Sequence, residues 1–436
     1  MGEIQDRHYV FWARHFNDID HMVPIIHGLL KYGVPVERIR YVMSNPLPPV
    51  YPKRDQRLSF LTSRGVTLET PHLSSVSFFL YHFLRQLGET SRLFSVLFSR
   101  MERLYSHYFV PHHFQRFPNW RHALKVVEAT PPGSLFIFDH SPSKMYRALV
   151  KKGHEKGIAS VAVPHGLLTF WEHPNPDSDT PLYGKECDFF DKKVMTDAFF
   201  ASQRSPGLSP GKAVTLGSAR FCPEWMAVIE KIYDSSLPRR ENRLHVLFLM
   251  EKAKAGTSDV YDISMEEQFA LVSLLDEDPG VELFIKRNTR GISPQQSRFL
   301  AARQSRQFGD EVTTHELVSW ADVVVGSHSS VILDPMMRGK VVLLPVYMSR
   351  FPFIFDEYKL SWLSHSRKEF AEQMDALKKK IPEDPYGDPN SRKFLTDLIF
   401  AGNPKADILH DYFLFLSGSA IEPQRVEHRS EQQKST

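Results

Sequence analysis

The chain has 436 residues, of which 42% are hydrophobic and 24% are charged. This balance is typical of a globular protein with a sizeable core and excludes a disordered or fibrous chain. The length predicts two domains. Lys and Arg number 54 against 51 Asp and Glu, and a formal charge of only +3 predicts no nucleic-acid partner.

Cysteine content and hydropathy limit the compartment. The only cysteines, Cys187 and Cys222, exclude a disulfide framework and lack the paired spacing of a structural zinc site. The N-terminus lacks the pattern of a secretory signal, and no run of about 18 apolar residues predicts a membrane span. We therefore expect a cytoplasmic protein whose membrane contact is at most peripheral, on the inner face.

The first half alternates between strand and helix patterns. The predicted elements are, in chain order, a strand at 8–14, a helix over 23–33, a strand at 41–43, a helical Phe- and Leu-rich stretch at 76–110, a strand at 135–138, a helix at 143–152, and strands at 159–163, 194–195 and 214–216. This alternation predicts βαβ units and a parallel sheet.

A polar segment at 234–243 predicts a linker, after which the alternation begins again. The second series comprises a strand at 244–250, a helix at 265–275, a strand at 281–286, helices at 293–304 and 315–319, a strand at 323–325, a helix at 330–338, a strand at 341–345, and helices at 367–379 and 405–417. The strands are fully apolar, as expected when helices cover both faces of a parallel sheet.

The predicted fold class is therefore α/β, with two Rossmann-like domains whose parallel sheets face a cleft. The predicted divisions are an acceptor-binding domain at 1–233, the linker at 234–243, a donor-binding domain at 244–404, a C-terminal helix at 405–419 and a disordered tail at 420–436. Chemistry is expected in the loops at the carboxyl ends of strands.

The segment 320–345 carries the strongest site signal. A buried strand ends in Gly326, and Ser327, His328, Ser329 and Ser330 follow directly before a predicted helix. Hydroxyls and backbone N–H groups at a helix N-terminus bind phosphate, although serines there are also common helix caps. Asp334, one turn further on, is positioned to accept hydrogen bonds from ribose hydroxyls.

Three further residues are candidates for acid–base chemistry. His165 follows the strand at 159–163 in a Pro-His-Gly turn and is a candidate general base or phosphate donor. Asp20 lies in the loop after the first strand, beside His21 and near Asp18, for which helix capping is an equal alternative. Asp139 ends the strand that begins at Leu135. For a lone histidine, a structural role is the usual alternative.

Two weaker signals complete the candidate site. Lys286 and Arg287 end a strand and are candidates to neutralise a diphosphate, and Gly217 and Ser218 form a turn at the end of the first domain; exposure on the surface is the alternative for both. The chain has no Walker loop, no GxGxxG motif after the first strand and no HExxH motif. NTPase, dehydrogenase and zinc-protease activities therefore lack their main sequence support.

The order of an Ala-Asp strand at Ala321, a serine-rich turn, Asp334 and a Gly-Lys pair at Gly339 resembles the nucleotide-binding half of GT-B glycosyltransferases. It is most similar to the bacterial capsule and lipopolysaccharide group with Kdo and sialic acid transferases, CDP-glycerol glycerophosphotransferases and UDP-GlcNAc 2-epimerases. The turn at Gly217 and Arg220 resembles that group's Gly-Ser-Pro-Arg turn. The sequence departs from that group's motif at two positions. Asp334 is followed by proline, where the group has Glu and a small residue, and Asn288 stands in place of a histidine.

The resemblance implies a GT-B enzyme that transfers a sugar from a nucleotide-activated donor to a surface polysaccharide or lipid-linked glycan, without a metal cofactor. The alternatives are a CDP-polyol phosphotransferase, a nucleotide-sugar epimerase and a non-catalytic glycan-binding scaffold. Aromatic and basic residues in the stretch 76–110, chiefly at 78–84, favour peripheral contact with an anionic membrane, and core packing is the alternative for most of them.

Overall fold

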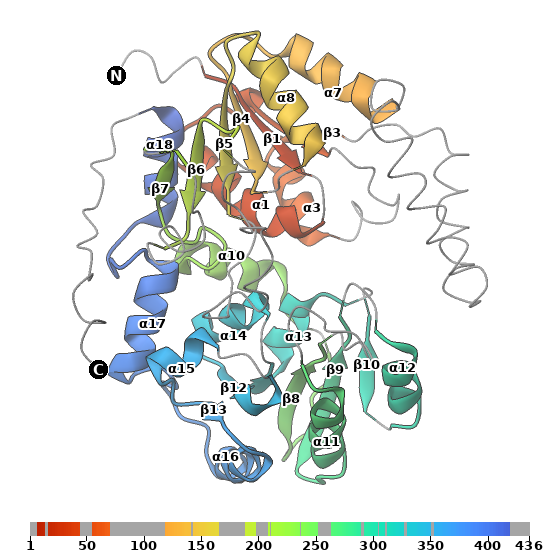
Figure 1. Ribbon diagram of the computed structural model, residues 1–436. Coiled ribbons are helices and arrows are strands. Elements are labelled where there is room, and N and C mark those ends of the chain that lie inside the picture. The colour runs from red at the N-terminus through yellow and green to blue at the C-terminus, as the bar shows by residue number, and fades with distance from the viewer. Residues whose placement is uncertain are drawn as a thin grey trace.

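The structure is a computed structural model (Figure 1). It describes residues 7–13, 16–43, 55–69, 118–140, 143–164, 188–197, 208–209, 211–235, 237–251, 263–288, 292–303, 305–309, 312–326, 329–349 and 353–418. Three of the predicted features lie outside these ranges, namely the stretch 76–110, the tail 420–436, and the candidate residues His165, Ser327 and His328.

The first domain is built on a parallel sheet of seven strands. These are β1 (Tyr9–Ala13), β2 (Ile39–Met43), β3 (Thr67–Glu69), β4 (Leu135–Asp139), β5 (Ala159–Val163), β6 (Lys192–Met195) and β7 (Ala213–Thr215), in the spatial order β3-β2-β1-β4-β5-β6-β7. The central strands β1 and β4 are buried along their whole length. Such strands read as continuous apolar runs because helices cover both faces of the sheet.

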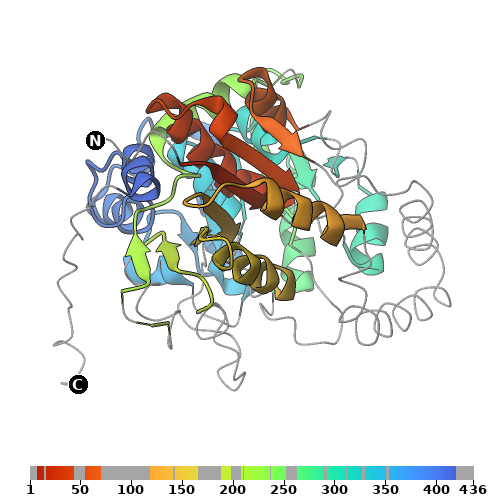
Figure 2. The same cartoon turned by 90° about the horizontal axis from the view of Figure 1, so that it is seen from above.

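Helices lie on both faces of this sheet, as Figures 1 and 2 show. They are α1 (Phe16–Lys31), the 3-10 turn η2 (Val36–Arg38), α3 (Gln56–Ser63), α7 (Pro118–Ala129), α8 (Lys144–His154) and α10 (Pro223–Ile232). An apolar core lies on each face of the sheet, and alternate residues of β1 belong to one core or the other. Val10 and Trp12 pack with residues of α7 and α8, whereas Tyr9 and Phe11 belong to the larger core with α1, α3 and α10.

The second domain has a parallel sheet of six strands. These are β8 (Leu244–Leu249), β9 (Val281–Lys286), β10 (Arg306–Phe308), β11 (Val323–Val325), β12 (Val341–Pro345) and β13 (Leu363–Ser364), in the order β10-β9-β8-β11-β12-β13. Its helices are α11 (Met265–Asp276), α12 (Pro294–Ala301), α13 (Thr314–Trp320), η5 (Ser330–Ile332), α14 (Leu333–Met337), η6 (Val346–Met348), α15 (Ile354–Tyr358), α16 (Arg367–Lys379), α17 (Pro389–Ile399) and α18 (Ile408–Ser417).

The predicted fold class, an α/β chain with two Rossmann-like parallel sheets, is confirmed. The strands predicted at 159–163, 281–286, 323–325 and 341–345 and the helix at 367–379 have the predicted bounds. The continuous helix predicted over 330–338 is wrong, because residues 330–332 form a 3-10 turn before the short α14. Pro335 has no N–H to donate to the carbonyl of Val331, so the first turn cannot close as α-helix.

The two domains meet through α10, which contacts α13 and α14 of the second domain (Figure 1). The predicted linker 234–243 lies between α10 and β8. It is attached to the second domain by Trp320, whose Nε1 donates to the carbonyl of Pro238 at 3.0 Å, and by Arg239, whose guanidinium bonds Asp322 at 2.5 Å. The larger apolar core is continuous from the first domain into the second.

The chain returns to the first domain at its C-terminal end, where α18 packs against α1 (Figure 1). The packing is close, because a methyl group on Gly28 of α1 would lie 3.1 Å from Cβ of Leu409. The return passes over the turn at Gly217, whose carbonyl accepts from the Tyr412 hydroxyl at 3.2 Å, while the N–H of Ser218 donates to Ile399 at 2.8 Å. The turn therefore ties the crossing segment to the first domain.

No helix among the residues that the structure describes is both long and apolar enough to span a bilayer.

Replacing Gly217 by alanine should lower the free energy of unfolding by more than about 1–3 kcal/mol, the usual cost of a strained backbone conformation. Gly217 has φ +82°, and an added Cβ would lie 2.5 Å from the carbonyl oxygen of Ile399. Gly133 is the matched control, since it has φ +77° with no atom near the added Cβ. Chemical denaturation of both variants measures the difference, and equal losses would show that the crossing contact contributes nothing.

Candidate active site

Each sheet has one point at which the order of its strands reverses. In the first sheet this point lies between β1 and β4, and in the second it lies between β8 and β11. In open α/β sheets, ligands bind outside the carboxyl ends of the strands at such points. Several of the predicted site residues follow these four strands.

Asp20 and Asp139 both lie at the reversal point of the first sheet. Asp20 is in the first turns of α1, directly after β1, and Asp139 is the last residue of β4. The register pairs Asp139 with Val163, so the carboxyl ends of β4 and β5 are level. Asp18 is completely buried and Asp139 is 1% exposed.

The serine-rich segment lies at the reversal point of the second sheet. Gly326 follows β11 and packs against the end of β8, since a Cβ at Gly326 would be 3.3 Å from Cδ1 of Leu249. The side chain of Ser329 accepts from the N–H of Val331 at 3.4 Å and so caps η5, and Ser330 is the first residue of that turn. The capping role that the sequence left open is therefore present for Ser329.

Lys286 is the last residue of β9 and Arg287 follows it, on the strand that is separated from β11 by β8. The Lys286 side chain is buried, and its Nζ donates to the carbonyl of Val312 at 2.9 Å and to that of Gly309. The N–H of Arg287 donates to the carbonyl of Phe308 at 2.9 Å. Lys286 thus fixes the segment after β10, and its predicted role toward a diphosphate stays a prediction.

The first domain contributes two carboxylates and two guanidiniums to a buried ionic cluster at the domain interface. Arg57 of α3 binds Asp55, the N-cap of that helix, through Nε at 3.0 Å and Nη2 at 2.7 Å. Its Nη1 pairs with one oxygen of Asp20. The other oxygen of Asp20 lies 3.0 Å from Nη2 of Arg220, in the turn before α10. Both carboxylates therefore have an arginine partner.

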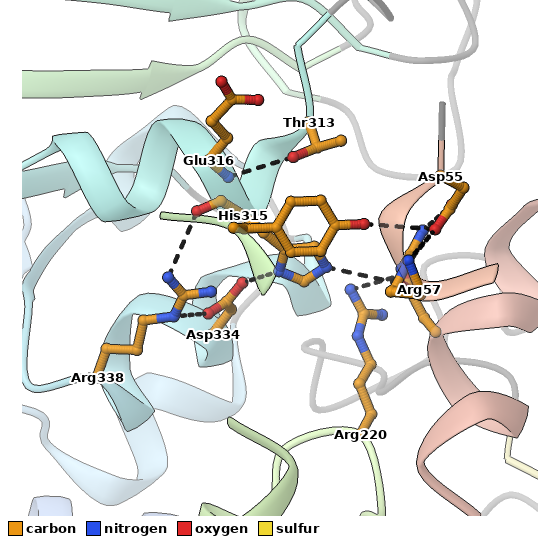
Figure 3. Close-up of polar contacts among 10 residues, drawn as sticks. Asp55, Arg57, Arg220, Thr313, His315, Glu316, Asp334 and Arg338 are labelled. Atoms are coloured by element: carbon orange, nitrogen blue, oxygen red, sulfur yellow. Dashed lines mark hydrogen bonds and ion pairs between the residues drawn. The ribbon is translucent and has the colours of Figure 1, made fainter. Parts of the chain in front are cut away.

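The second domain contributes His315, Asp334 and Arg338 (Figure 3). Nδ1 of His315, on α13, bonds one oxygen of Asp334, and Nε of Arg338 lies 2.6 Å from the other. Asp334 has no exposed surface. Nη1 of Arg338 also donates to Ser319 at 2.8 Å, which fixes the guanidinium against α13.

Two groups join these halves. Nε2 of His315 lies 3.7 Å from Oδ1 of Asp20, and the ring stacks on Tyr233 with centroids 5.1 Å apart. Tyr233 donates from its hydroxyl to Asp55 at 3.4 Å, and its carbonyl accepts from the Ser319 hydroxyl at 2.8 Å. Figure 3 shows His315 between Asp55, Arg57 and Arg220 on one side and Asp334 and Arg338 on the other.

The charges of the cluster balance when His315 is neutral. Burial lowers the pKa of His315 below its usual value, although Asp334 opposes this shift. Burial alone would raise the pKa of Asp334, but His315 and the neighbouring arginines lower it. Burial also lowers the pKa of Arg220, to about 10. Asp20, Asp55 and Asp334 thus face Arg57, Arg220 and Arg338 around a neutral imidazole.

Asp20 and Asp334 were singled out from the sequence, whereas His315, Arg57 and Arg338 were not. Arg338 follows Asp334 by four residues on the same helical face, which is a spacing that favours an ion pair. That signal was available. His315 and Arg57 meet Asp20 only through the packing of α1, α3 and α13, for which the sequence offers no local sign. Among the described residues, no group of His, Cys, Asp and Glu is arranged to hold a metal ion.

No family profile and no curated protein matches the sequence. Solved structures do match the fold. A UDP-N-acetylglucosamine 2-epimerase aligns with a TM-score of 0.52 and 12% identity over 95% of this chain and 97% of its own. A co-structure of S. aureus MnaA with UDP has a TM-score of 0.50 and 12% identity, with 89% and 95% covered. The wall teichoic acid polymerase TagF, soaked with CDPG, has 0.50 and 10%, with 94% and 90% covered.

At these identities the likeness shows the fold alone. Together with the two parallel sheets, it shows the two-domain GT-B architecture, which glycosyltransferases and UDP-N-acetylglucosamine 2-epimerases share. The predicted GT-B fold is thereby confirmed.

Acidification below about pH 7 should lower the free energy of unfolding, and His315→Gln should reduce this dependence. The pKa of His315 is lower in the folded protein than its usual value of 6.5, so the unfolded chain binds the proton first. His27 contributes in the same direction, because burial lowers its pKa as well. The free energy of unfolding is measured by denaturation at several pH values from about 7.5 to 5. Its slope against pH should be steepest for wild type, smaller for His315→Gln and for His27→Gln, and smallest for the double variant. A wild-type slope in His315→Gln would contradict the assignment.

Proposed function

We propose that the protein is a glycosyltransferase that moves a sugar from a nucleotide-activated donor to a surface polysaccharide or lipid-linked glycan. The observation that carries the proposal is the position of the segment 326–330, which follows β11 at the strand-order reversal of the second sheet. This is where nucleotides bind in open α/β sheets. Of its described residues, Gly326 allows close backbone approach, and Ser329 and Ser330 supply hydroxyls.

In this proposal the second domain holds the donor. Ser327, His328, Ser329 and Ser330 donate hydrogen bonds to the phosphates, with Lys286 and Arg287 supplying positive charge from the end of β9. Fixed donors and basic groups of this kind stabilise a departing phosphate without a metal ion. The nucleotide-activated sugar is a co-substrate, and no other cofactor takes part.

The first domain holds the acceptor near the ends of β1, β4 and β5. Asp20, Asp139 and His165 follow those strands, and from the sequence each is a candidate to take the proton of the acceptor hydroxyl. Among GT-B glycosyltransferases, we place the enzyme with the capsule and lipopolysaccharide transferases, because the sequence motif around Asp334 resembles theirs.

A nucleotide-sugar epimerase is the second candidate. One matched structure is named a UDP-N-acetylglucosamine 2-epimerase, and another, MnaA, was solved with UDP. The two activities give different products. A transferase releases free nucleotide only when an acceptor or water takes the sugar. An epimerase changes the configuration of UDP-N-acetylglucosamine with no acceptor present.

The proposal is tested with a panel of CMP-, CDP-, UDP- and GDP-linked compounds. A bound compound stabilises the folded protein by mass action, so the melting temperature should rise with at least one member of the panel. The products of that compound are then analysed with and without a crude glycan acceptor. Absence of any thermal shift would remove the proposed function, and a changed sugar configuration without acceptor would favour the epimerase.

Replacing Ser329 and Ser330 together by alanine should weaken nucleotide binding by about tenfold or more, since two hydrogen bonds of about 1 kcal/mol each are lost. Ser366→Ala is the matched control, because Ser366 caps α16 through the N–H of Glu369 and lies away from the strand-order reversal. Both variants lose a capping hydroxyl. Titration calorimetry with the nucleotide selected above should separate them, and equal affinities would contradict the phosphate-binding role.

A lipid-linked acceptor predicts association with anionic membranes through residues 78–84, which lie outside the described residues. The protein should therefore float with vesicles of anionic phospholipid at low salt and dissociate as salt is raised. A variant in which Phe78, Phe79 and Phe83 are replaced by serine should float less. If wild type and variant both remain with the soluble fraction, the acceptor reaches the enzyme from solution.

A further inference from the structure

The pair formed by His315 and Asp334 lies where chemistry is expected in the second domain. His315 is the second residue of α13, which follows β10, and Asp334 is the second residue of α14, which follows β11. Helices that follow parallel strands begin at the carboxyl edge of the sheet. Both side chains therefore lie at the edge that faces the first domain, and Figure 3 shows His315 between Asp334 and the arginines Arg57 and Arg220 of that domain.

We propose that His315 is the catalytic base, which accepts the proton of the acceptor hydroxyl at Nε2, and that Asp334 and Arg338 are its positioning residues. The inference rests on the proposed function and deepens it, because it assigns the proton transfer to a residue that the sequence motifs did not indicate.

The hydrogen bond to Asp334 sets the tautomer of the ring. An ionised carboxylate only accepts hydrogen bonds, so Nδ1 of His315 carries the hydrogen in this contact. A neutral imidazole has one N–H, and Nε2 is then left with a lone pair. Arg338 pairs with the second oxygen of Asp334 at 2.6 Å, which keeps the carboxylate ionised and oriented.

The Nε2 edge of the ring faces the first domain, where the acceptor is proposed to bind. Oδ1 of Asp20 lies 3.7 Å from Nε2, which is too long for a hydrogen bond. The same carboxylate is held by Arg57 and Arg220. Each oxygen of Asp20 is thus paired with a guanidinium, whereas Nε2 of His315 lies beyond hydrogen-bond distance of this carboxylate.

The charged and titratable groups that face His315 come from every element packed around it, and they are Asp20 of α1, Asp55 and Arg57 of α3, Arg220 before α10, Tyr233 after α10, and Asp334 and Arg338 of the second domain. With the ring neutral, the carboxylates and guanidiniums among them balance. A proton that arrives at Nε2 gives an imidazolium between Asp20 and Asp334, and both carboxylates stabilise it. Burial, Arg57 and Arg338 oppose this charge, so the ring is neutral until it receives the proton.

The step conserves atoms and electrons. The acceptor hydroxyl oxygen forms a bond to the anomeric carbon of the donor while the bond from that carbon to the phosphate oxygen breaks. The hydroxyl proton passes to Nε2 of His315, and the nucleotide leaves with the electron pair of the broken bond. This single displacement inverts the configuration at the anomeric carbon.

The protonation state is tested directly by long-range ¹⁵N–¹H NMR of protein labelled at histidine, with the His315 signals identified by their loss in His315→Gln. At about pH 7.5 the ring should be neutral with hydrogen on Nδ1. A cation, or a neutral ring with hydrogen on Nε2, would overturn the inference because neither accepts a proton at Nε2. This measurement requires no substrate.

Catalysis is tested with the nucleotide-sugar that gives the largest thermal shift, by measuring nucleotide release with water as the acceptor. His315→Gln should lower kcat by about 10²–10⁴-fold and change KM by less than about threefold. It should also remove the loss of activity that wild type shows on acidification. A merely structural role would not change the pH profile in this way.

His245→Gln is the matched control, because His245 is also a buried histidine between two carboxylates of the second domain. Its Nδ1 lies 2.8 Å from Asp322 and its Nε2 3.4 Å from Glu282, but it is at the start of β8, on the opposite edge of the sheet. This variant should retain kcat within about twofold. Asp334→Asn adds a second distinction, since loss of rate with intact nucleotide affinity supports positioning of His315, and loss of affinity alone supports the ribose contact instead.

The outcomes separate the inference from the proposed function. If wild type binds a nucleotide-sugar and His315→Gln cleaves it as fast as wild type does, the base is not His315 and the proposed function stands. If no nucleotide of the panel binds to wild type, the proposed function itself is contradicted, and the inference falls with it.

Discussion

The mutual neutralisation of buried charges at the domain interface is the constraint on which the rest of the structure depends. Ions as buried as Arg57 and Asp334 are stable only when each has a partner, because an unpaired buried charge costs about 3–5 kcal/mol. The partners come from α1, α3, the turn before α10, α13 and α14. The packing of these elements therefore has to be correct within each domain.

The two halves of the cluster are also neutral separately. In the first domain Asp20 and Asp55 balance Arg57 and Arg220, and in the second Asp334 balances Arg338. The contacts that join the halves are not ion pairs between two charged groups. They are the hydrogen bond from Ser319 to the Tyr233 carbonyl at 2.8 Å, the 3.7 Å approach of His315 to Asp20 and the stacking of the same ring on Tyr233. Separating the domains would hydrate intact ion pairs and would not leave a charge without its partner. The continuous apolar core and the contacts of α10 with α13 and α14, and not ion pairing, therefore hold the domains together.

The sequence predicted the fold well where burial makes the local pattern unambiguous. The strands β5, β9, β11 and β12 are mainly apolar and largely buried, and their bounds were predicted correctly. Short strands at the sheet edges, such as β3 and β13, have too few residues to give a pattern and were missed. The helix predicted over 330–338 was divided by Pro335, a residue whose effect on hydrogen bonding was readable in advance.

The candidate site was less predictable, because its geometry depends on contacts between distant segments. Asp20 and Asp334 could be selected since each follows a strand, but the sequence indicated neither that they approach one histidine nor that Arg57 and Arg220 hold Asp20. A carboxylate selected for its charge is a different reagent once two guanidiniums surround it. Which residue can accept a proton is thus decided by the assembled interface. In the proposal that residue is His315, because its Nδ1 bonds Asp334 and the lone pair on Nε2 faces the first domain.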